Sequence, residues 1–189
     1  MTGNLAYESA WREELIGGKL VAMSPAATNH NRIAENIDFI FRSYLKGKKC
    51  VPLGDGYKVF LSPTDHYVPD FMIVCDRDKI KPRGIYGPPD LVVEVLSPST
   101  TQNDRGRKKT AYEANGVAEY WLVDPVGKSV EVYLLKEGQY SLDKVYFLYP
   151  EEELAEMLEE DREAVVSEFT CHLYDDLVIS LADIFDDLF

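Results

Sequence analysis

Asp90-Leu91-Val92-Val93-Glu94-Val95-Leu96 is the stretch of sequence that decides the fold. From Leu91 to Leu96 every residue except Glu94 is apolar, as expected of a central strand covered on both faces. An isolated carboxylate is costly to bury in such a strand unless something compensates its charge. A metal ion is one compensation; a salt bridge to a core Arg or Lys, or a strand end that reaches solvent, would be another.

The sequence around this strand alternates between strand and helix signals. Glu14 to Met23 is typical of two short strands around Gly17-Gly18, and Asn29 to Leu45 has the three- and four-residue apolar spacing of an amphipathic helix. A second helix is expected from about residue 101 to 115, before Gly116. Further strands are predicted at residues 57–61, 69–75, 119–123, 130–135 and 139–148. We therefore expect an α/β (α+β) fold, with an N-terminal β-hairpin and a central mixed β-sheet flanked by helices.

The length of the chain and its apolar content predict one domain. With 189 residues, 46% of them hydrophobic, residues 1–189 are enough for a sizeable core but short for two domains. The sequence starts without a basic region followed by an apolar one, and no later apolar run approaches the roughly 20 residues that span a bilayer. We expect a soluble, cytoplasmic protein with no membrane partner.

The acidic residues are unevenly distributed along the chain. The net charge is −13, but residues 150–189 hold 14 acids and one base, whereas residues 1–149 hold 19 acids and 19 bases. Within this acidic tail, the segment 150–163 is predicted to be an exposed helix or a partly disordered loop. In the neutral body the bases are clustered, so they could form a positive rim for nucleic acid or be ordinary solvated charges.

The cysteines give no sign of a zinc site or a disulfide framework. Cys50, Cys75 and Cys171 are far apart, without a C-x-x-C pair or a histidine at zinc-ligand spacing. Each is expected to be a small core residue. The three histidines are dispersed, so we expect each to make local hydrogen bonds.

Asp70 and Glu94 are the candidate ligands of a divalent cation. Asp70 follows Pro69 at the start of a predicted strand, and it could face the same ion as Glu94 if the two strands are neighbours. Oxygen ligands of this kind suit Mg²⁺ or Mn²⁺; the alternative for Asp70 is turn chemistry. Asp90 also follows a proline, but it lies roughly 13 Å from Glu94 at about 3.3 Å per residue. It is at best a supporting group.

Lys108 is the candidate base or charge stabiliser. It shares a helix face with Asp104 and Tyr112, whereas Lys109 points off that face. A lysine beside Glu94 could lower the pKa of an attacking water or stabilise negative charge on a phosphate. The alternative is a surface ion pair between Asp104 and Lys108, which would contribute little.

Several of these segments together resemble a known family. The stretches are Pro69-Asp70, Pro89 to Thr100, Asp104 to Lys108, Tyr112, Gly116-Val117 and Glu119 to Pro125. They are similar to the Uma-two family of restriction endonucleases, within the PD-(D/E)XK nuclease superfamily, and the likeness runs from Met23-Ser24-Pro25 to Leu181–Phe185. The resemblance implies a restriction-endonuclease-like core with Asp70 and Glu94 as metal ligands. It also implies Glu35 as a further acid near the metal, although a solvated position on the helix suits Glu35 equally well.

The sequence departs from the superfamily pattern at one position. The pattern has a lysine two residues after the strand glutamate, and here that position is Leu96. The resemblance implies that Lys108 supplies the amine from the following helix, which requires that helix to pack over the Glu94 strand.

The first hypothesis is therefore a Mg²⁺- or Mn²⁺-dependent phosphodiesterase acting as a DNA endonuclease. Its catalytic residues would be Asp70, Glu94 and Lys108, with Glu35, Asp90 and Tyr112 as accessory candidates. One alternative is a catalytically silent nucleic-acid-binding or assembly module on the same fold, and another is the same chemistry on RNA. A homodimer is expected if tyrosines form an exposed patch; otherwise they line one face of a hairpin. These tyrosines are Tyr133, Tyr140, Tyr146 and Tyr149.

Overall fold

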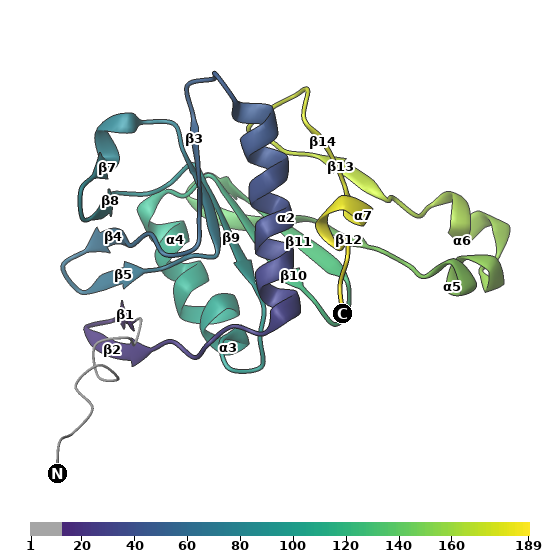
Figure 1. Cartoon of the computed structure of the whole chain (residues 1–189), viewed down its shortest axis with the longest axis horizontal. Helices are drawn as coiled ribbons and strands as arrows, with labels where there is room; N and C mark the ends of the chain where they lie inside the picture. Colours follow the sequence, from purple (N-terminus) through teal and green to yellow (C-terminus); the bar gives the residue numbers. More distant parts are fainter. Residues whose placement is uncertain (1–12) are drawn as a thin grey trace, which may run out of the picture.

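The predicted central strand, β9 (Leu91–Val95), lies inside a six-stranded sheet in the computed structural model, which describes residues 13–189 (Figure 1). We call it the central sheet; its order is β12-β11-β10-β9-β6-β3. β9 pairs in parallel with β10 and antiparallel with β6, so the sheet is mixed, as predicted. The other strands are β3 (Val51–Gly54), β6 (Phe71–Val74), β10 (Glu119–Asp124), β11 (Ser129–Lys136) and β12 (Gln139–Phe147).

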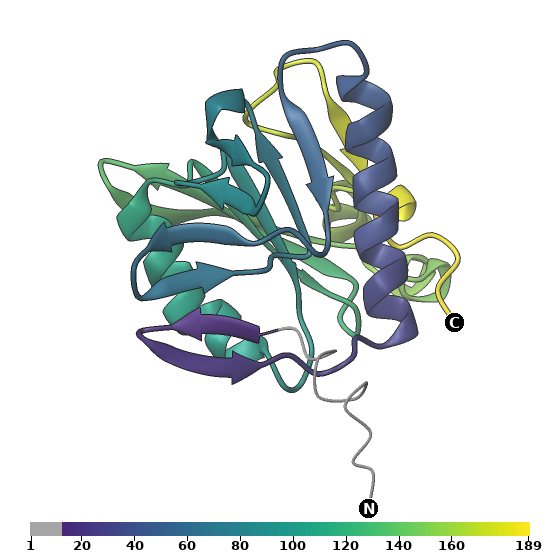
Figure 2. The same ribbon diagram turned by 60° about the vertical axis from the view of Figure 1, so that its left-hand side comes forward.

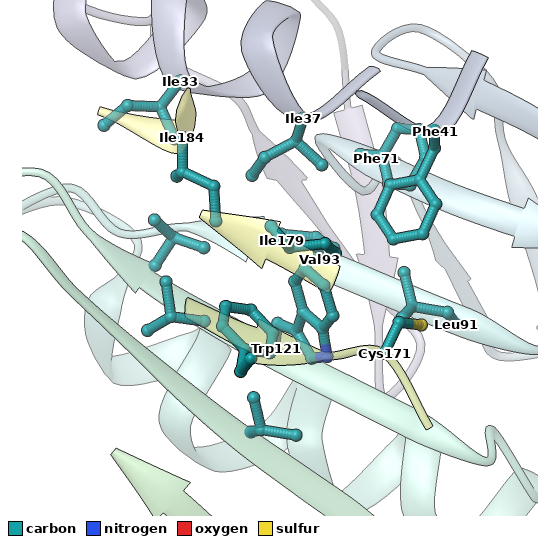
Figure 3. Packing of buried hydrophobic residues seen from close by; sticks show 14 of the residues in the cluster. Ile33, Ile37, Phe41, Phe71, Leu91, Val93, Trp121, Cys171, Ile179 and Ile184 are labelled. Atoms are coloured by element: carbon teal, nitrogen blue, oxygen red, sulfur yellow. The ribbon is translucent and has the colours of Figure 1, made fainter. Parts of the chain in front are cut away.

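Helix α2 (Thr28–Leu45) covers one face of the central sheet. The ring of Phe41 stacks on Phe71 with centroids 5.1 Å apart, and it also contacts Trp121 (Figure 3). Each such fully buried apolar side chain contributes about 1.5–3 kcal/mol. The C-terminal elements complete this core. They are β13 (Glu168–Thr170), β14 (Val178–Ser180) and α7 (Leu181–Ile184).

A second six-stranded sheet, the outer sheet, packs against the opposite face of the central sheet (Figure 2). Its order is β2-β1-β5-β4-β8-β7. The predicted hairpin is present in it, with Gly17 and Gly18 at φ +56° and +76° in the turn. Its strands are β1 (Glu13–Ile16), β2 (Lys19–Ala22), β4 (Val59–Ser62), β5 (Asp65–Tyr67), β7 (Ile80–Lys81) and β8 (Gly84–Tyr86).

One helical segment follows β9 and lies beside the outer sheet. It consists of α3 (Thr101–Asn103), a π-helical turn (Asp104–Lys108) and α4 (Lys109–Asn115), and it ends at Gly116 with φ +85°, as predicted. Among residues 13–189, no helix is both long enough and apolar enough to span a membrane.

The acidic segment forms two short helices, α5 (Glu151–Glu156) and α6 (Glu159–Glu163). Neither has a buried residue, so the expectation of an exposed helix is confirmed. Figure 1 shows this acidic arm projecting from the body on the side away from β1 and β2.

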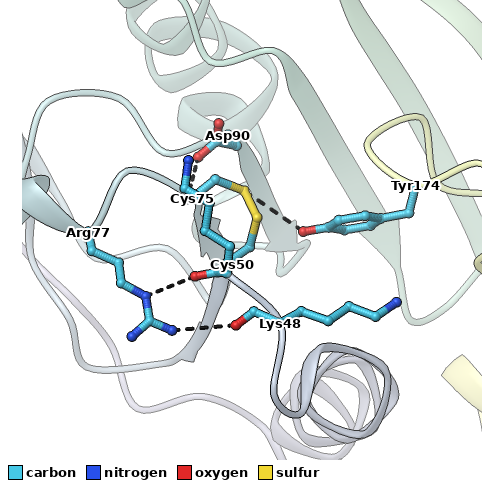
Figure 4. The surroundings of a disulfide bond; sticks show 7 residues. Lys48, Cys50, Cys75, Arg77, Asp90 and Tyr174 are labelled. Atoms are coloured by element: carbon cyan, nitrogen blue, oxygen red, sulfur yellow. Dashed lines mark hydrogen bonds between the residues drawn. A yellow bond between two sulfur atoms is a disulfide. The ribbon is translucent and has the colours of Figure 1, made fainter.

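The cysteine prediction is wrong for two of the three residues. Cys50 and Cys75 form a disulfide between the ends of β3 and β6, next to Asp90 and Tyr174 (Figure 4). They are 25 residues apart in sequence, but the antiparallel pairing of the two strands places them opposite each other. Cys171 is a buried free cysteine, as expected. Disulfides persist mainly in oxidising compartments. This bond therefore argues against the cytoplasmic location, which stays a prediction.

The expected exposed tyrosine patch is also wrong. Tyr146 is buried and stacks on Phe169, while Tyr133 and Tyr140 are half-buried against Tyr120. These rings serve the interior of the fold, and the homodimer stays a prediction without this support.

Candidate functional site

Lys108 lies at the centre of a buried cluster of carboxylates. Its Nζ is 3.0 Å from Glu14 Oε1, 3.0 Å from Glu94 Oε2 and 3.2 Å from Asp104 Oδ1. All four side chains are buried. Lys108 donates a hydrogen bond to Glu94, and its charge also faces the carboxylates of Glu14 and Asp104.

The elements of the fold explain why these residues meet. Asp104, Lys108 and Tyr112 recur every four residues and share one helix face, which packs over β9 as the Lys108 assignment requires. On β1, strand alternation turns Glu14 inwards beside the buried Ile16. The Glu14 carboxylate is fixed further because its Oε1 accepts the backbone N–H of Val68 at 2.9 Å.

Asp70 is held next to Glu94 by the main chain of β9. Its Oδ2 accepts the N–H of Val95, the residue after Glu94, at 2.7 Å. His30, in the first turn of α2, places Nε2 3.3 Å from the same oxygen. Burial lowers the pKa of His30, but the hydrogen bond and charge of Asp70 outweigh burial, so the pKa is raised. Among residues 13–189, both of these contacts are to Asp70 Oδ2, and no hydrogen-bond donor contacts Oδ1.

A cavity of about 540 Å³ joins these groups. Asp70, Glu94 and Lys108, the three residues predicted to be catalytic, all line it. The wall also includes His30 and Asp55, the linker from β2 to α2, and the loop after β9. The cavity is therefore polar at its base, and its walls are the start of α2 with the linker before it on one side and the loop after β9 on the other.

The charges at the base of the cavity do not balance. Burial favours the neutral form of Glu94 and raises its pKa well above the usual range, although Lys108 opposes this; Asp104, Asp70 and Glu14 raise it further. Burial disfavours the ammonium of Lys108, but the carboxylates outweigh that penalty, Glu94 most of all, and raise its pKa. Three acids thus share one lysine, with Asp70 beside His30, and an additional cation would relieve the repulsion among the four carboxylates.

The accessory candidates occupy three different settings. Tyr112 is buried and donates its hydroxyl to Glu94 Oε1 at 2.8 Å, so it belongs to the cluster. Glu35 is 72% exposed beside Arg32, bordering a neighbouring hollow that also includes Asp70. Asp90 lies at the far end of β9, where it accepts the Cys75 N–H at 2.7 Å, so the structure does not bring it to the cavity.

Sequence reasoning missed Glu14 and His30, although each carried a signal. Glu14 alternates with Ile16 on one strand face, which marks a carboxylate on an apolar face. His30 precedes Ile33 and Ile37 by three and seven residues, which puts it on the buried face of α2. Asp104 was predicted to share a helix face with Lys108, but its place in a buried cluster was not predicted.

The carboxylates of Asp70 and Glu94, which line one cavity, are ligands that a hard divalent cation can use. Mg²⁺ is typically bound through one or two carboxylates, several waters and a substrate phosphate. Among residues 13–189, no group of three or more His, Cys, Asp or Glu side chains is arranged to hold a metal ion. Asp70 and Glu94 therefore fit a partly hydrated ion better than a fully protein-ligated one.

The arrangement of the two sheets and their flanking helices has a counterpart among solved structures. The crystal structure of "a putative nuclease belonging to DUF820" from Anabaena variabilis ATCC 29413 superposes with a TM-score of 0.64 and 19% sequence identity. The alignment covers 92% of this chain and 89% of that chain. This chain thus shares the fold of that protein.

Residues 4–167 match the family model Uma2, described as "Putative restriction endonuclease", and the chain belongs to this family. The resemblance seen in the sequence is confirmed. Two relatives come from Synechocystis sp. (strain ATCC 27184 / PCC 6803 / Kazusa). The "Uncharacterized protein slr1290" is 33% identical over 133 residues, 68% of this chain and 70% of the relative. The "Uncharacterized protein sll1609" is 25% identical over 126 residues, 65% of this chain and 71% of the relative.

Proposed function

We propose that this protein is a Mg²⁺- or Mn²⁺-dependent nuclease that hydrolyses phosphodiester bonds in DNA. The observation that carries the proposal is that Asp70, Glu94 and the buried Lys108 all line one cavity of a nuclease-like fold. The family description supports a nucleic-acid substrate. The presence of all three residues favours catalysis over a silent module on the same fold.

Asp70 and Glu94 would hold the metal ion. When bound, such an ion supplies Lewis-acid stabilisation of the phosphate and activates water at neutral pH. The Val95 N–H and His30 orient the Asp70 carboxylate, while Tyr112 and Lys108 each bond one oxygen of Glu94. Carboxylate oxygens have two lone pairs each, so these hydrogen bonds leave capacity for an ion.

Lys108 is better suited to the role of a fixed cation than to that of a base. Its raised pKa keeps it protonated at neutral pH, and its Nζ is already within ion-pair distance of three carboxylates. A general base must be able to accept a proton near the operating pH. We assign to Lys108 the positioning of Glu94 and a positive charge beside the reacting phosphate.

The metal ion and Asp70 can be tested together. Purified protein is expected to cut DNA in Mg²⁺ or Mn²⁺ and not in EDTA, and Asp70→Asn should lower the rate more than the roughly 10- to 100-fold typical of residues that only support metal ligands. The rate of loss of supercoiled plasmid and of labelled linear DNA is the measurement.

Asp90→Asn is the matched control for Asp70→Asn, because Asp90 also follows a proline at a strand start but lies outside the cavity. It should cut at the wild-type rate. Equal cleavage by wild type and Asp70→Asn, or cleavage that persists in EDTA, would contradict the proposal.

The acidic arm is expected to have little effect on DNA binding. Exposed charges are screened over about 8 Å at physiological salt, and α5 and α6 project from the body (Figure 1). Replacing Glu151, Glu152 and Glu153 by Gln should leave the Kd for DNA, measured by anisotropy in EDTA, within about twofold of wild type. A much tighter complex would show instead that the arm inhibits binding, and deleting residues 150–163 should then strengthen it further.

A further inference from the structure

The outer sheet has one face on the core and one in solvent, and the solvent face carries a continuous row of apolar and aromatic side chains. Strand pairing places each member opposite the next across four neighbouring strand pairs. We call this set the aromatic row; in spatial order it is Leu20, Leu15, His66, Phe60 and Tyr86. None of the five belongs to the buried core clusters.

The three rings of the row contact one another in sequence, His66 with Phe60 and Phe60 with Tyr86. Phe60 and Tyr86 stack with centroids 4.7 Å apart and planes 18° apart, and His66 lies 5.5 Å from Phe60. Tyr86 is 46% exposed. Gly84 is required here, because a Cβ would lie 2.9 Å from the Phe60 ring and 2.4 Å from the Lys58 carbonyl oxygen. The absence of a side chain at Gly84 therefore allows β8 to lie close to β4 beside the Phe60 ring.

Positive charge surrounds the tyrosine end of the row. Lys58 is two residues before Phe60 on the same strand face, and Lys81 and Arg83 are at the exposed turn before β8. In the part of the chain that the structure describes, none of the three has a carboxylate within ion-pair distance. Burial, aided by Lys58, lowers the pKa of His66, so its ring is neutral near pH 7. Neutral rings beside unpaired cations are complementary to bases and phosphates.

Short stretches of chain connect the row to the cavity. His66 precedes Asp70 by four residues, so the chain between them spans at most about 13 Å at about 3.3 Å per residue. On the other side, Asp55 lines the cavity and leads through the exposed Tyr57 to Phe60. A strand of nucleic acid lying on the row would therefore reach the cavity within a few nucleotides.

We propose that the aromatic row binds unpaired bases, so that the substrate engages this protein as single-stranded nucleic acid. The proposal rests on the proposed function for its link to cleavage. Every base has a π-face that can stack on an exposed ring, whereas bases in a duplex are already stacked on one another. Lys58, Lys81 and Arg83 contact the phosphates on either side.

Binding without cleavage tests the row directly. In EDTA, anisotropy of a labelled oligothymidylate of about 20 nucleotides, which exceeds the span of one such surface, is expected to show tighter binding than a duplex of equal length. Tyr86→Ala should weaken single-strand binding about tenfold, and Tyr86→Trp should restore it. Lys81→Gln with Arg83→Gln should reduce the slope of log affinity against log salt by about 1.4.

Phe147→Ala is the matched control, because Phe147 is 42% exposed but lies on β12 of the central sheet. It should bind as wild type does. Equal affinity for duplex and single strand, or an unchanged Kd in Tyr86→Ala, would overturn the proposal. A dimer in sedimentation velocity that Tyr86→Ala dissociates would also overturn it, since a second copy would then cover this face.

The two proposals fail separately. Glu94→Gln should bind oligothymidylate normally, because Glu94 lies at the cavity and not on the row. If binding depends on Tyr86 but no DNA is cut, the aromatic row stands and the nuclease assignment falls. If DNA is cut with unchanged binding in Tyr86→Ala, the reverse holds.

Discussion

Glu94→Gln is expected to reduce metal-dependent cleavage at least about a hundredfold, the upper end of what loss of a mere supporting group costs. The amide removes the negative charge that the ion needs but keeps the size and the hydrogen-bonding oxygen of the side chain. The Glu94→Gln variant can also be tested without measuring cleavage, through stabilisation by Mn²⁺. Wild type should be stabilised by about 2.7 kcal/mol when free Mn²⁺ is about a hundred times its Kd, and Glu94→Gln should lose this rise in Tm.

Glu119→Gln is the control for this variant. Glu119 is a glutamate on the neighbouring strand β10, only 1% exposed, with its Oε1 bound to the Trp121 indole at 2.7 Å, and it does not line the cavity. It should cut DNA and respond to Mn²⁺ as wild type does. A Glu94→Gln protein that keeps both the cleavage rate and the Mn²⁺-induced rise in Tm would remove Glu94 from the metal site.

Lys108→Met is expected to lower the free energy of unfolding by about 4 kcal/mol. The substitution leaves three buried carboxylates, those of Glu14, Glu94 and Asp104, facing one another without their shared cation. Urea denaturation followed by tryptophan fluorescence measures the change. Adding Glu94→Gln to Lys108→Met should recover at least about 1 kcal/mol, because the two residues are directly coupled.

The next residue provides the comparison. Lys109 is half-buried, with its Nζ 3.7 Å from the centre of the Tyr133 ring, and Lys109→Met should cost less than about 1 kcal/mol, as for an exposed cation–π contact. Equal stability of the two methionine variants would mean that Lys108 does not neutralise the buried carboxylates.

The long periodic elements could be predicted from the sequence, and the short ones could not. Helix α2 begins one residue before the predicted start, and β9 matches the predicted apolar strand within one residue at each end. The outer sheet as a whole was missed beyond its hairpin and β4, because strands of two to four residues carry too little alternation to be distinguished from loops. The disulfide was missed because the cysteines meet only through the pairing of β3 with β6.

The candidate site was predicted where the residues are close in sequence or match a family motif. Asp104, Lys108 and Tyr112 follow from helical spacing, and Asp70 beside Glu94 needed only that β6 and β9 be neighbours. Glu14 could not be placed, because its approach to Lys108 depends on how the outer sheet packs. The same contact makes the Asp104–Lys108 pair, considered as a surface pair in the alternative interpretation, part of a buried cluster. Of the two predicted roles of Lys108, the raised pKa favours charge stabiliser over base.

The two sides of β1 contribute to different surfaces, the buried carboxylate cluster and the aromatic row. Glu14 faces Lys108 on the inner side of the strand, and Leu15 belongs to the aromatic row on the solvent side. The two side chains are on opposite sides because side-chain direction alternates along a strand with a period of two residues. A one-residue insertion or deletion in the Gly17-Gly18 turn that slipped this strand would exchange them, placing a hydrocarbon against the ammonium group and a carboxylate on the row. The length of one tight turn, remote from any reacting atom, thus sets the chemical identity of both surfaces.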